Sequence, residues 1–434
     1  MDKDYIIRLI RTFNPQWAEG AGRDRKKADI PKFKRDIYTK LKENIGKKQI
    51  IALTGMRRVG KTTLMKQLIS ELPQKSCIYF SFDEKDLQNK EVLIFVIDYF
   101  LNNFKGKYIF FDEIHYIPDW QGVLKRYYDT GGMKFIISGS ASLQIRKGHE
   151  SLAGRLMTYY LPPLNFREFL ALRGNTVVLK GNLKENYESM LPRKEYFENM
   201  FNEYIYKGAF PEIAGEDDEE FIRDYIKEMV IRKIILEDIP EIFDIKKKDA
   251  LYDLFKFACK ESSNLFEITN LSGMLNVDAA TISNYLLYLK LSFLIKISET
   301  YSRSIVTRIR KSKKIYVIHP SIAFAVLNYS KDLLDVEQVA GQYVETLFAE
   351  NFFWRSKEKH EVDAIIDNGK LLPVEVKYRN QICKKDLKGL LKFSDKFACK
   401  QGIVITRDLF KIEVVDNVEL QFVPAWLSCL VHQQ

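Results

Sequence analysis

The chain contains 434 residues, which is enough for about two to four domains rather than a single hydrophobic core. Hydrophobic residues make up 46% of it and charged residues 29%, with only 12 prolines and 21 glycines. This balance is typical of a packed protein and excludes a disordered or fibrous one. The 68 basic side chains exceed the 58 acidic ones and give a formal net charge of +10. A charge of this sign favours a polyanionic partner such as nucleic acid, but its size does not establish one.

The cysteines and the hydropathy of the chain indicate its compartment. The five cysteines are scattered without a C-x-x-C pair, so they predict neither a zinc site nor a disulfide framework. The first residues lack the apolar core of a signal peptide, and no later stretch reaches the ~18 apolar residues needed to cross a bilayer. We therefore expect a cytoplasmic protein that is neither exported nor inserted into a membrane.

The first part of the chain predicts an α/β domain. Residues 1–49 are polar and basic, and residues 34–45 are expected to form a helix because their apolar positions recur at helical spacing. In residues 50–160, short apolar runs alternate with helical patterns. These runs are 49–53, 77–82, 108–111 and 134–138. Such runs are typical of buried parallel strands joined by crossover helices, which is the doubly wound pattern.

Three further segments follow. Residues 161–245 lose the strands and become amphipathic and aromatic, which predicts a helical lid. Residues 246–320 combine helical patterns with two β-rich runs, in the order of a winged helix. Residues 321–434 contain a helix followed by strands and predict a second α/β unit.

A glycine-rich loop with the spacing Gly-x-x-x-x-Gly-Lys-Thr follows the first apolar run. Phosphate binding requires backbone N–H groups that converge on the anion without Cβ atoms in the way, followed by a helix N-terminus. In this pattern Lys61 would reach the β- and γ-phosphates of ATP, and the Thr62 hydroxyl would hold Mg²⁺. Arg57 and Arg58 could contact phosphate or a partner, or simply be solvated. The predicted ATP-binding residues are Gly55, Met56, Arg57, Arg58, Val59, Gly60, Lys61, Thr62 and Thr63.

Two acids end the strand expected at residues 108–111. Asp112 can hold Mg²⁺ through its coordination shell, and Glu113 can polarise the water that attacks the γ-phosphate. Together with the phosphate loop, they predict Mg²⁺-dependent ATP hydrolysis in which Lys61, Asp112 and Glu113 are catalytic.

Two later features are candidates for the same reaction. Ser138 or Ser140, after the next strand, could sense the γ-phosphate or align water beside Glu113, although serines there are equally consistent with a turn. Arg155 could act as an arginine finger on the transferring phosphoryl group, within its own chain or from a neighbouring one. Alternatively, it forms a salt bridge on the surface.

These motifs carry a resemblance to a known family. They are residues 55–62, 111–115, 138–140, 152–156, 161–169 and 208–212. The chain resembles the archaeal-type AAA ATPases related to the STAND group over most of residues 30–380. The resemblance implies a P-loop ATPase core joined to a helical lid, a winged helix and a restriction-endonuclease-like domain.

A helix-turn-helix pattern lies within the expected winged helix. It comprises residues 266–275 and 279–289, with Asp278 placed to cap the second helix. Thr281, Ser283 and Asn284 could then recognise DNA, and the basic run 308–314 could bind phosphates from the wing. Alternatively, the run is a solvated hairpin tip and the helices pack only against the ATPase, since winged helices also bind proteins.

The C-terminal segment carries acidic residues that match the PD-(D/E)XK nuclease-like fold: Glu345 on a helix, Asp363 on a strand, and Glu375 with Lys377 on the next strand. Carboxylates of this kind gather Mg²⁺ to activate water, while the lysine positions water or neutralises charge. Residues 375 and 377 point to the same face of their strand. Val362 stands where the pattern has proline. A solvated acidic hairpin or an inactive relic would carry the same residues.

The strand register tests this metal site. A two-residue turn at Asn368 and Gly369 would pair Asp363 with Val374 and place it on the face opposite Glu375. The site therefore requires a three-residue loop or a bulge, and we predict the longer loop.

The sequence as a whole predicts an α/β protein with a parallel-sheet AAA ATPase core. ATP and Mg²⁺ would act at this core and control a DNA-binding, nuclease-like C-terminal domain. The alternative is an ATP-dependent switch that binds a partner and whose nuclease-like domain is inactive. An arginine finger from a neighbouring chain would need a homo-oligomer, which no residue demands.

Overall fold

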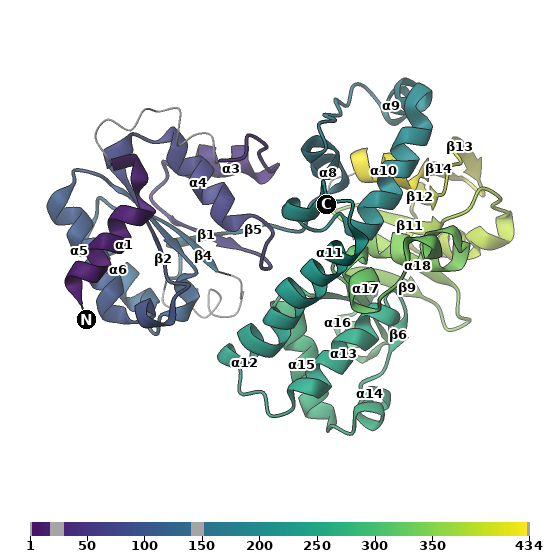
Figure 1. Ribbon diagram of the computed structural model, residues 1–434. Helices are drawn as coiled ribbons and strands as arrows, with labels where there is room; N and C mark the ends of the chain where they lie inside the picture. Colours follow the sequence, from purple (N-terminus) through teal and green to yellow (C-terminus); the bar gives the residue numbers. More distant parts are fainter. Residues whose placement is uncertain (1, 18–29, 140–151, 432–434) are drawn as a thin grey trace. The chain divides into compact units, whose positions relative to one another are not determined.

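The computed structural model describes residues 2–17, 30–139 and 152–431. The chain forms two compact units, Met1–Pro162 and Pro163–Gln434, each built on one sheet (Figure 1). Both units combine helices and strands, which confirms the predicted α/β class. No helix in the described ranges combines the length and hydrophobicity needed to cross a lipid bilayer.

The N-terminal unit contains five parallel strands in the order β2-β3-β4-β1-β5. They are β1 Ile50–Thr54, β2 Cys77–Ser81, β3 Tyr108–Asp112, β4 Lys134–Gly139 and β5 Leu156–Tyr160. The first four are the predicted apolar runs. The fifth strand, β5, was not predicted, because this edge strand is only partly buried and lacks a continuous apolar run.

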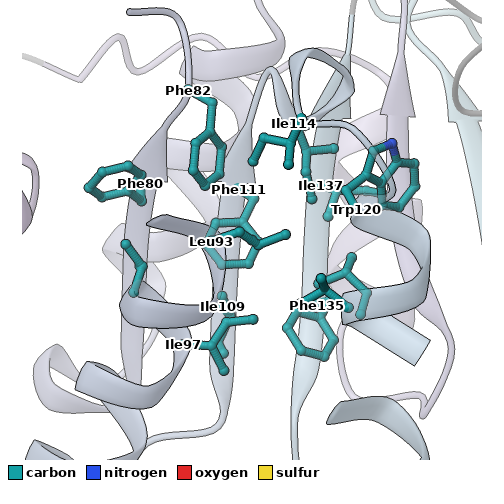
Figure 2. Packing of buried hydrophobic residues seen from close by; sticks show 14 of the residues in the cluster. Phe80, Phe82, Leu93, Ile97, Ile109, Phe111, Ile114, Trp120, Phe135 and Ile137 are labelled. Carbon is teal, nitrogen blue, oxygen red and sulfur yellow. The ribbon is translucent and has the colours of Figure 1, made fainter. Parts of the chain in front are cut away.

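Helices cover both faces of this sheet (Figure 1). They are α1 Lys3–Phe13, α3 Ile37–Asn44, α4 Lys61–Glu71, α5 Lys90–Asn103 and α6 Trp120–Thr130. Alternate strand residues such as Phe80, Ile109 and Phe111 pack against α1, α5 and α6 in one apolar cluster (Figure 2). Side chains alternate between the faces of a strand, so Asp112 and Ser138 point to the face opposite this cluster.

The N-terminal segment is part of the ATPase unit. Ile6 and Ile10 of α1 belong to the apolar cluster. The Asn14 side chain donates a hydrogen bond to the Tyr79 carbonyl at 2.7 Å and accepts one from the Tyr79 N–H at 2.8 Å. The predicted helix at 34–45 is α3, and the basic stretch around Arg23 lies outside the described residues.

The C-terminal unit begins with the helices expected after residue 160. They are α8 Phe166–Leu172, α9 Leu183–Met190, α10 Lys194–Lys207, α11 Glu219–Asp224, two π-helical stretches Tyr225–Arg232 and Ile234–Asp238, and α12 Ile239–Ile242. The next elements are α13 Lys248–Lys260, β6 Leu265–Phe266, α14 Ile268–Leu275, α15 Ala279–Leu291, β7 Ile295–Thr300, α16 Ile305–Arg310 and β8 Lys313–Val317. The Asp278 side chain accepts the Thr281 N–H at 2.9 Å, so it caps α15 as predicted.

The remaining elements complete a nine-stranded sheet. They are α17 Pro320–Val326, α18 Glu337–Leu347, β9 Phe352–Arg355, β10 Glu361–Asp367, β11 Leu371–Lys377, α19 Lys388–Phe397, β12 Gln401–Thr406, β13 Lys411–Val415, β14 Val418–Pro424 and α20 Ala425–Val431. The strand order is β13-β14-β12-β11-β10-β9-β7-β8-β6. Because β7 pairs with β9, the strands expected of the winged helix and those expected of the nuclease-like domain share one sheet.

The hairpin of β10 and β11 has the predicted three-residue loop. Asp367 pairs with Leu371 and Ala364 with Val374, so residues 368–370 form the turn. Continuing this register by one residue places Asp363 opposite Glu375, on the same face of the sheet.

Candidate functional site

The phosphate loop joins the end of β1 to the start of α4. A Cβ atom at Gly55 would lie 2.4 Å from the Leu161 carbonyl oxygen, so this position excludes any larger residue. Gly60 has φ 101°, a left-handed conformation that favours glycine, and caps α4. The buried Lys61 ammonium donates to the carbonyls of Gly55 and Met56 at 3.0 and 3.1 Å. The lysine therefore lies against the loop that would cradle the phosphates.

The other loop residues differ in exposure: Met56 and Val59 are buried, Arg57 and Thr63 are partly exposed, and Arg58 is exposed. The Arg57 guanidinium donates to the Tyr116 hydroxyl at 3.1 Å, so it packs beside the segment that follows Glu113. Arg35, which the sequence analysis did not single out, is buried and donates to the Val59 carbonyl at 2.7 Å. It thereby supports the loop from outside.

Asp112 is the best-supported carboxylate of the unit. It is 3% exposed and accepts hydrogen bonds from the hydroxyls of Thr62 at 2.6 Å, of Tyr79 at 2.8 Å, and of Ser138. Asp112, Thr62 and Ser138 were predicted, and they meet here. Tyr79 was missed, although a tyrosine within a buried apolar strand is a signal that its hydroxyl needs a partner. Ser140 lies outside the described residues.

Glu113 follows in a left-handed conformation with φ 53°, a backbone geometry that residues other than glycine seldom adopt. Its N–H donates to Ser138 Oγ at 3.1 Å, and its carboxylate lies 3.7 Å from Lys61 Nζ and 3.1 Å from His115 Nδ1. Burial alone would raise the pKa of Glu113, but Lys61 and His115 outweigh it and hold this pKa well below its usual range. Glu113 therefore stays ionised and can orient water. The buried His115 is a second residue whose role was missed.

The structure does not bring Arg155 to the nucleotide site of its own chain. Arg155 Nε donates to Asp129 Oδ1 at 2.9 Å, which is the surface salt bridge weighed as the alternative. Ile50 pairs with Leu156 in the parallel β1–β5 register, so Arg155 lies where these strands begin. The phosphate loop follows Thr54, where they end. Supply of Arg155 by a neighbouring chain stays a prediction.

The C-terminal unit gathers a second set of charged residues, which we call the carboxylate cluster: Lys314, Glu345, Glu361, Asp363, Glu375 and Lys377. Lys377 Nζ lies 2.5 Å from Glu375 Oε1 and 4.0 Å from Asp363 Oδ2. The Asp363 carboxylate also accepts the Val376 N–H at 2.8 Å. The four predicted residues of the PD-(D/E)XK pattern are thus brought together.

Lys314 was assigned wrongly to a DNA-binding wing. It is 2% exposed, and its ammonium lies 2.9 Å from Glu345, 2.7 Å from Glu361 and 3.5 Å from Asp363. Arg308 is also not a free wing residue, because its Nε donates to the Ser302 carbonyl and its guanidinium lies over an aromatic ring. Side chains within one basic run can therefore point to entirely different surroundings.

The two lysines of the carboxylate cluster offset only part of the repulsion between its carboxylates. Burial, and then the charge of Asp363, raises the pKa of Glu345 to about 7 and that of Glu375 to about 8. Lys314 and Lys377 oppose these shifts without cancelling them. Glu375 Oε2 is buried and has no hydrogen-bond partner.

The metal ligands predicted in the C-terminal unit do not form an open site. Within the described residues, no group of three or more His, Cys, Asp or Glu side chains is arranged to hold a metal ion. The physical reason in the carboxylate cluster is the Lys314 ammonium, which already lies among the oxygens that a metal would bind.

Family models and similar proteins show which family the chain belongs to. An AAA domain matches residues 47–170, and two domains of unknown function, DUF8612 and DUF4143, match residues 198–333 and 336–426. Uncharacterized protein MJ1544 of Methanocaldococcus jannaschii is 30% identical over 368 residues, which are 80% of this chain and 78% of that protein. The chain belongs to the family of MJ1544. Its N-terminal unit carries a P-loop AAA domain.

Two further relatives are also described as uncharacterized proteins. Protein MJ1637 of the same organism is 27% identical over 94% of this chain and 91% of its own length. Protein Rv2008c of Mycobacterium tuberculosis is 24% identical over 79% and 74%, respectively. The family therefore does not by itself supply an activity.

Solved structures resemble the chain only distantly. An S. cerevisiae Hsp104–ADP complex has a TM-score of 0.31 and 15% identity, covering 65% of this chain and 39% of that one. A mutant of Thermotoga maritima RuvB has a TM-score of 0.29 and 16% identity, covering 67% and 96%. TM-scores this low bear on neither the activity nor the partners of this chain.

The raised pKa of Glu375 predicts how stability depends on pH. The folded state favours protonated Glu375, so this contribution is complete below about pH 4.5 and is lost as the pH rises through about 8. We expect Glu375→Gln, which mimics the protonated form, to raise the melting temperature of the C-terminal unit at pH 9 more than at pH 6, as measured by calorimetry.

Glu413→Gln is the matched control, since Glu413 lies on β13 and pairs with Lys411 away from the cluster. The melting temperature of this variant should differ between pH 9 and pH 6 by as much as that of the wild type. Equal melting shifts for Glu375→Gln at both pH values would contradict the raised pKa.

Proposed function

We propose that this protein is a Mg²⁺-dependent ATPase whose nucleotide state controls a DNA-binding, nuclease-like C-terminal unit. The observation that carries the ATPase part is the convergence of Lys61, Thr62, Asp112, Glu113 and Ser138 at the carboxyl ends of parallel strands. In open α/β sheets, ligands bind outside this edge of the sheet.

Each residue has a distinct part in the proposed reaction. The loop N–H groups and Lys61 bind the phosphates, and Thr62 with Asp112 would hold Mg²⁺, which neutralises charge on the β- and γ-phosphates. Glu113 accepts a hydrogen bond from the attacking water and orients it. Ser138 fixes both acids, because its hydroxyl donates to Asp112 and accepts from the Glu113 N–H.

The DNA-binding part is supported by the order of elements between residues 248 and 317. Two helices, α14 and α15, are followed by the antiparallel pair β7 and β8, and the short β6 pairs with β8, which fits a winged helix. Ser283 and Asn284 are exposed on α15, where a recognition helix would contact bases. Lys311 and Lys313 remain candidates for phosphate contacts.

A second candidate function is favoured by the burial of Lys314 in the carboxylate cluster. In this alternative, the ATPase is a switch that binds a partner, and the nuclease-like fold cleaves nothing. A lysine held by three carboxylates supports it, because the ammonium leaves these oxygens less available to a metal.

The ATPase proposal predicts separate effects on binding and hydrolysis. Glu113→Gln should lower kcat for ATP by about 100-fold or more while ATP binding persists, since only water activation is lost. Lys61→Ala should weaken ATP binding itself, because the loop loses its positive charge. Phosphate release and binding of a fluorescent ATP analogue measure the two effects.

Glu91→Gln and Lys90→Ala at the start of α5 are matched controls, since both positions are exposed and outside the loop. They should behave as the wild type. Unchanged turnover in Glu113→Gln would refute the role given to this residue.

Tyr79→Phe tests the support of Asp112. This change removes one of three hydroxyl donors and keeps the packed ring, so Asp112 should be held less firmly. We expect the Mg²⁺ concentration for half-maximal ATP hydrolysis to rise by about 10-fold or more. Tyr159→Phe is the control, because the buried Tyr159 hydroxyl has no hydrogen-bond partner. Equal Mg²⁺ dependence in both variants would show that Tyr79 is structural only.

Nucleotide control predicts that DNA affinity changes with the bound nucleotide. We expect plasmid DNA to bind with different affinities in ATP and ADP, and Lys61→Ala to lose that difference, as measured by gel shift. Incubation with Mg²⁺ or Mn²⁺ tests cleavage in the same samples. Cleavage that disappears in Glu375→Ala supports a metal-dependent nuclease, and cleavage that survives in Glu375→Ala excludes this assignment. If the wild type does not cleave DNA, the result favours the switch with an inactive nuclease-like fold.

A further inference from the structure

Lys314 brings a positive charge from one part of the nine-stranded sheet into another. It lies on β8, whereas its partners Glu345 and Glu361 lie on α18 and β10. The third carboxylate, Asp363, is two residues further along β10. A side chain that is 2% exposed and faces three carboxylates from other elements is a built contact rather than a surface salt bridge.

The chemistry of the contact resembles that of a bound cation. An ammonium is a compact charge with three donors, and here it has carboxylate oxygens at 2.7, 2.9 and 3.5 Å. Hard divalent cations such as Mg²⁺ and Mn²⁺ bind the same type of oxygen. The ammonium and a metal therefore compete for one set of ligands.

The cluster keeps a further acceptor for a ligand. Glu375 Oε2 is buried and unpartnered, although the other oxygen of this carboxylate lies 2.5 Å from Lys377. An unpaired buried carboxylate oxygen is costly unless something binds it. Besides Lys314, the ion pairs of the cluster's carboxylates are with Lys377 and Arg355 in the described part of the chain.

We propose that Lys314 is a built-in cation that takes the place of a divalent metal ion in the carboxylate cluster and closes the cluster to such ions. The proposal rests on the nuclease-like character proposed for the C-terminal unit, and it is independent of the ATPase chemistry. It assigns the closure to β8, which also belongs to the proposed winged helix.

β8 holds Lys314 in the cluster from both sides. On one side β8 pairs with β7 along its whole length, but on the other it meets only the two residues of β6. Lys314 itself pairs with Leu265 of β6 and Ser298 of β7. The lysine therefore lies on the part of β8 that is paired on both sides, and we expect it to stay in the cluster.

Binding of Mn²⁺ to the full chain without nucleotide tests the proposal, with paramagnetic resonance as the readout. Lys314→Met keeps a side chain of similar length and removes the charge. We expect it to gain one Mn²⁺ site at least about 10-fold tighter than any in the wild type. Adding Glu375→Gln should abolish the new site. Lys296→Met, on the neighbouring strand β7, is the matched control, because Lys296 donates to the Ala349 carbonyl and not to the cluster.

The wild type decides the proposal even if Lys314→Met does not fold. It should show no Mn²⁺ binding up to about 1 mM that Glu375→Gln removes. Glu375-dependent binding in the wild type would overturn the closure by Lys314 and leave the nuclease proposal intact. No gain in a folded Lys314→Met would overturn both the closure and the metal site, whereas ATP hydrolysis would be unchanged in either case.

Discussion

A buried carboxylate is stable only if its oxygens are hydrogen-bonded, and the nucleotide site depends on how Asp112 meets this requirement. Its three donors come from the start of α4, from β2 and from β4. They converge because the parallel strands β2, β3 and β4 are in register: Ser138 lies beside Asp112, and Tyr79, which pairs with Phe110, reaches Asp112 from two residues earlier. The apolar cluster under the opposite face of the sheet fixes this register. The core of the unit and its candidate chemistry are therefore consequences of one arrangement.

The two units satisfy buried negative charge in different ways. Asp112 is surrounded by neutral hydroxyls, which can rearrange toward an incoming cation at small electrostatic cost. The carboxylate cluster is instead held by Lys314 and Lys377, whose charges can be separated from their partners only at a high desolvation cost. This contrast fits the exchange of metal and nucleotide that we propose for the first site. The second suits a contact that stays made.

Sequence patterns predicted the features that depend on residues close together in the chain. Four strands of the first sheet, the phosphate loop and the Asp278 cap follow from residue spacing, and the structure confirms them. The three-residue hairpin loop, which it also confirms, followed from the requirement that Asp363 and Glu375 share a face of the sheet. The contacts of Tyr79 with Asp112 and of Lys314 with Glu345 join residues more than 25 positions apart, so no local pattern reports them. Arg155 shows the same limit, because its motif is recognisable but its position at the start of β5 depends on the register of the sheet.

The shared sheet limits how the C-terminal unit can change. Adjacent residues of a strand point to opposite faces, so a slip of β8 by one residue would carry Lys314 to the other side of the sheet. A slip by two residues would preserve the face but break every hydrogen-bonded pair with β7. Intermediate displacements are unfavourable, because they satisfy neither the strand ladder nor the three carboxylates. β8 therefore holds Lys314 in the cluster through its strand pairing as well as through the three carboxylates.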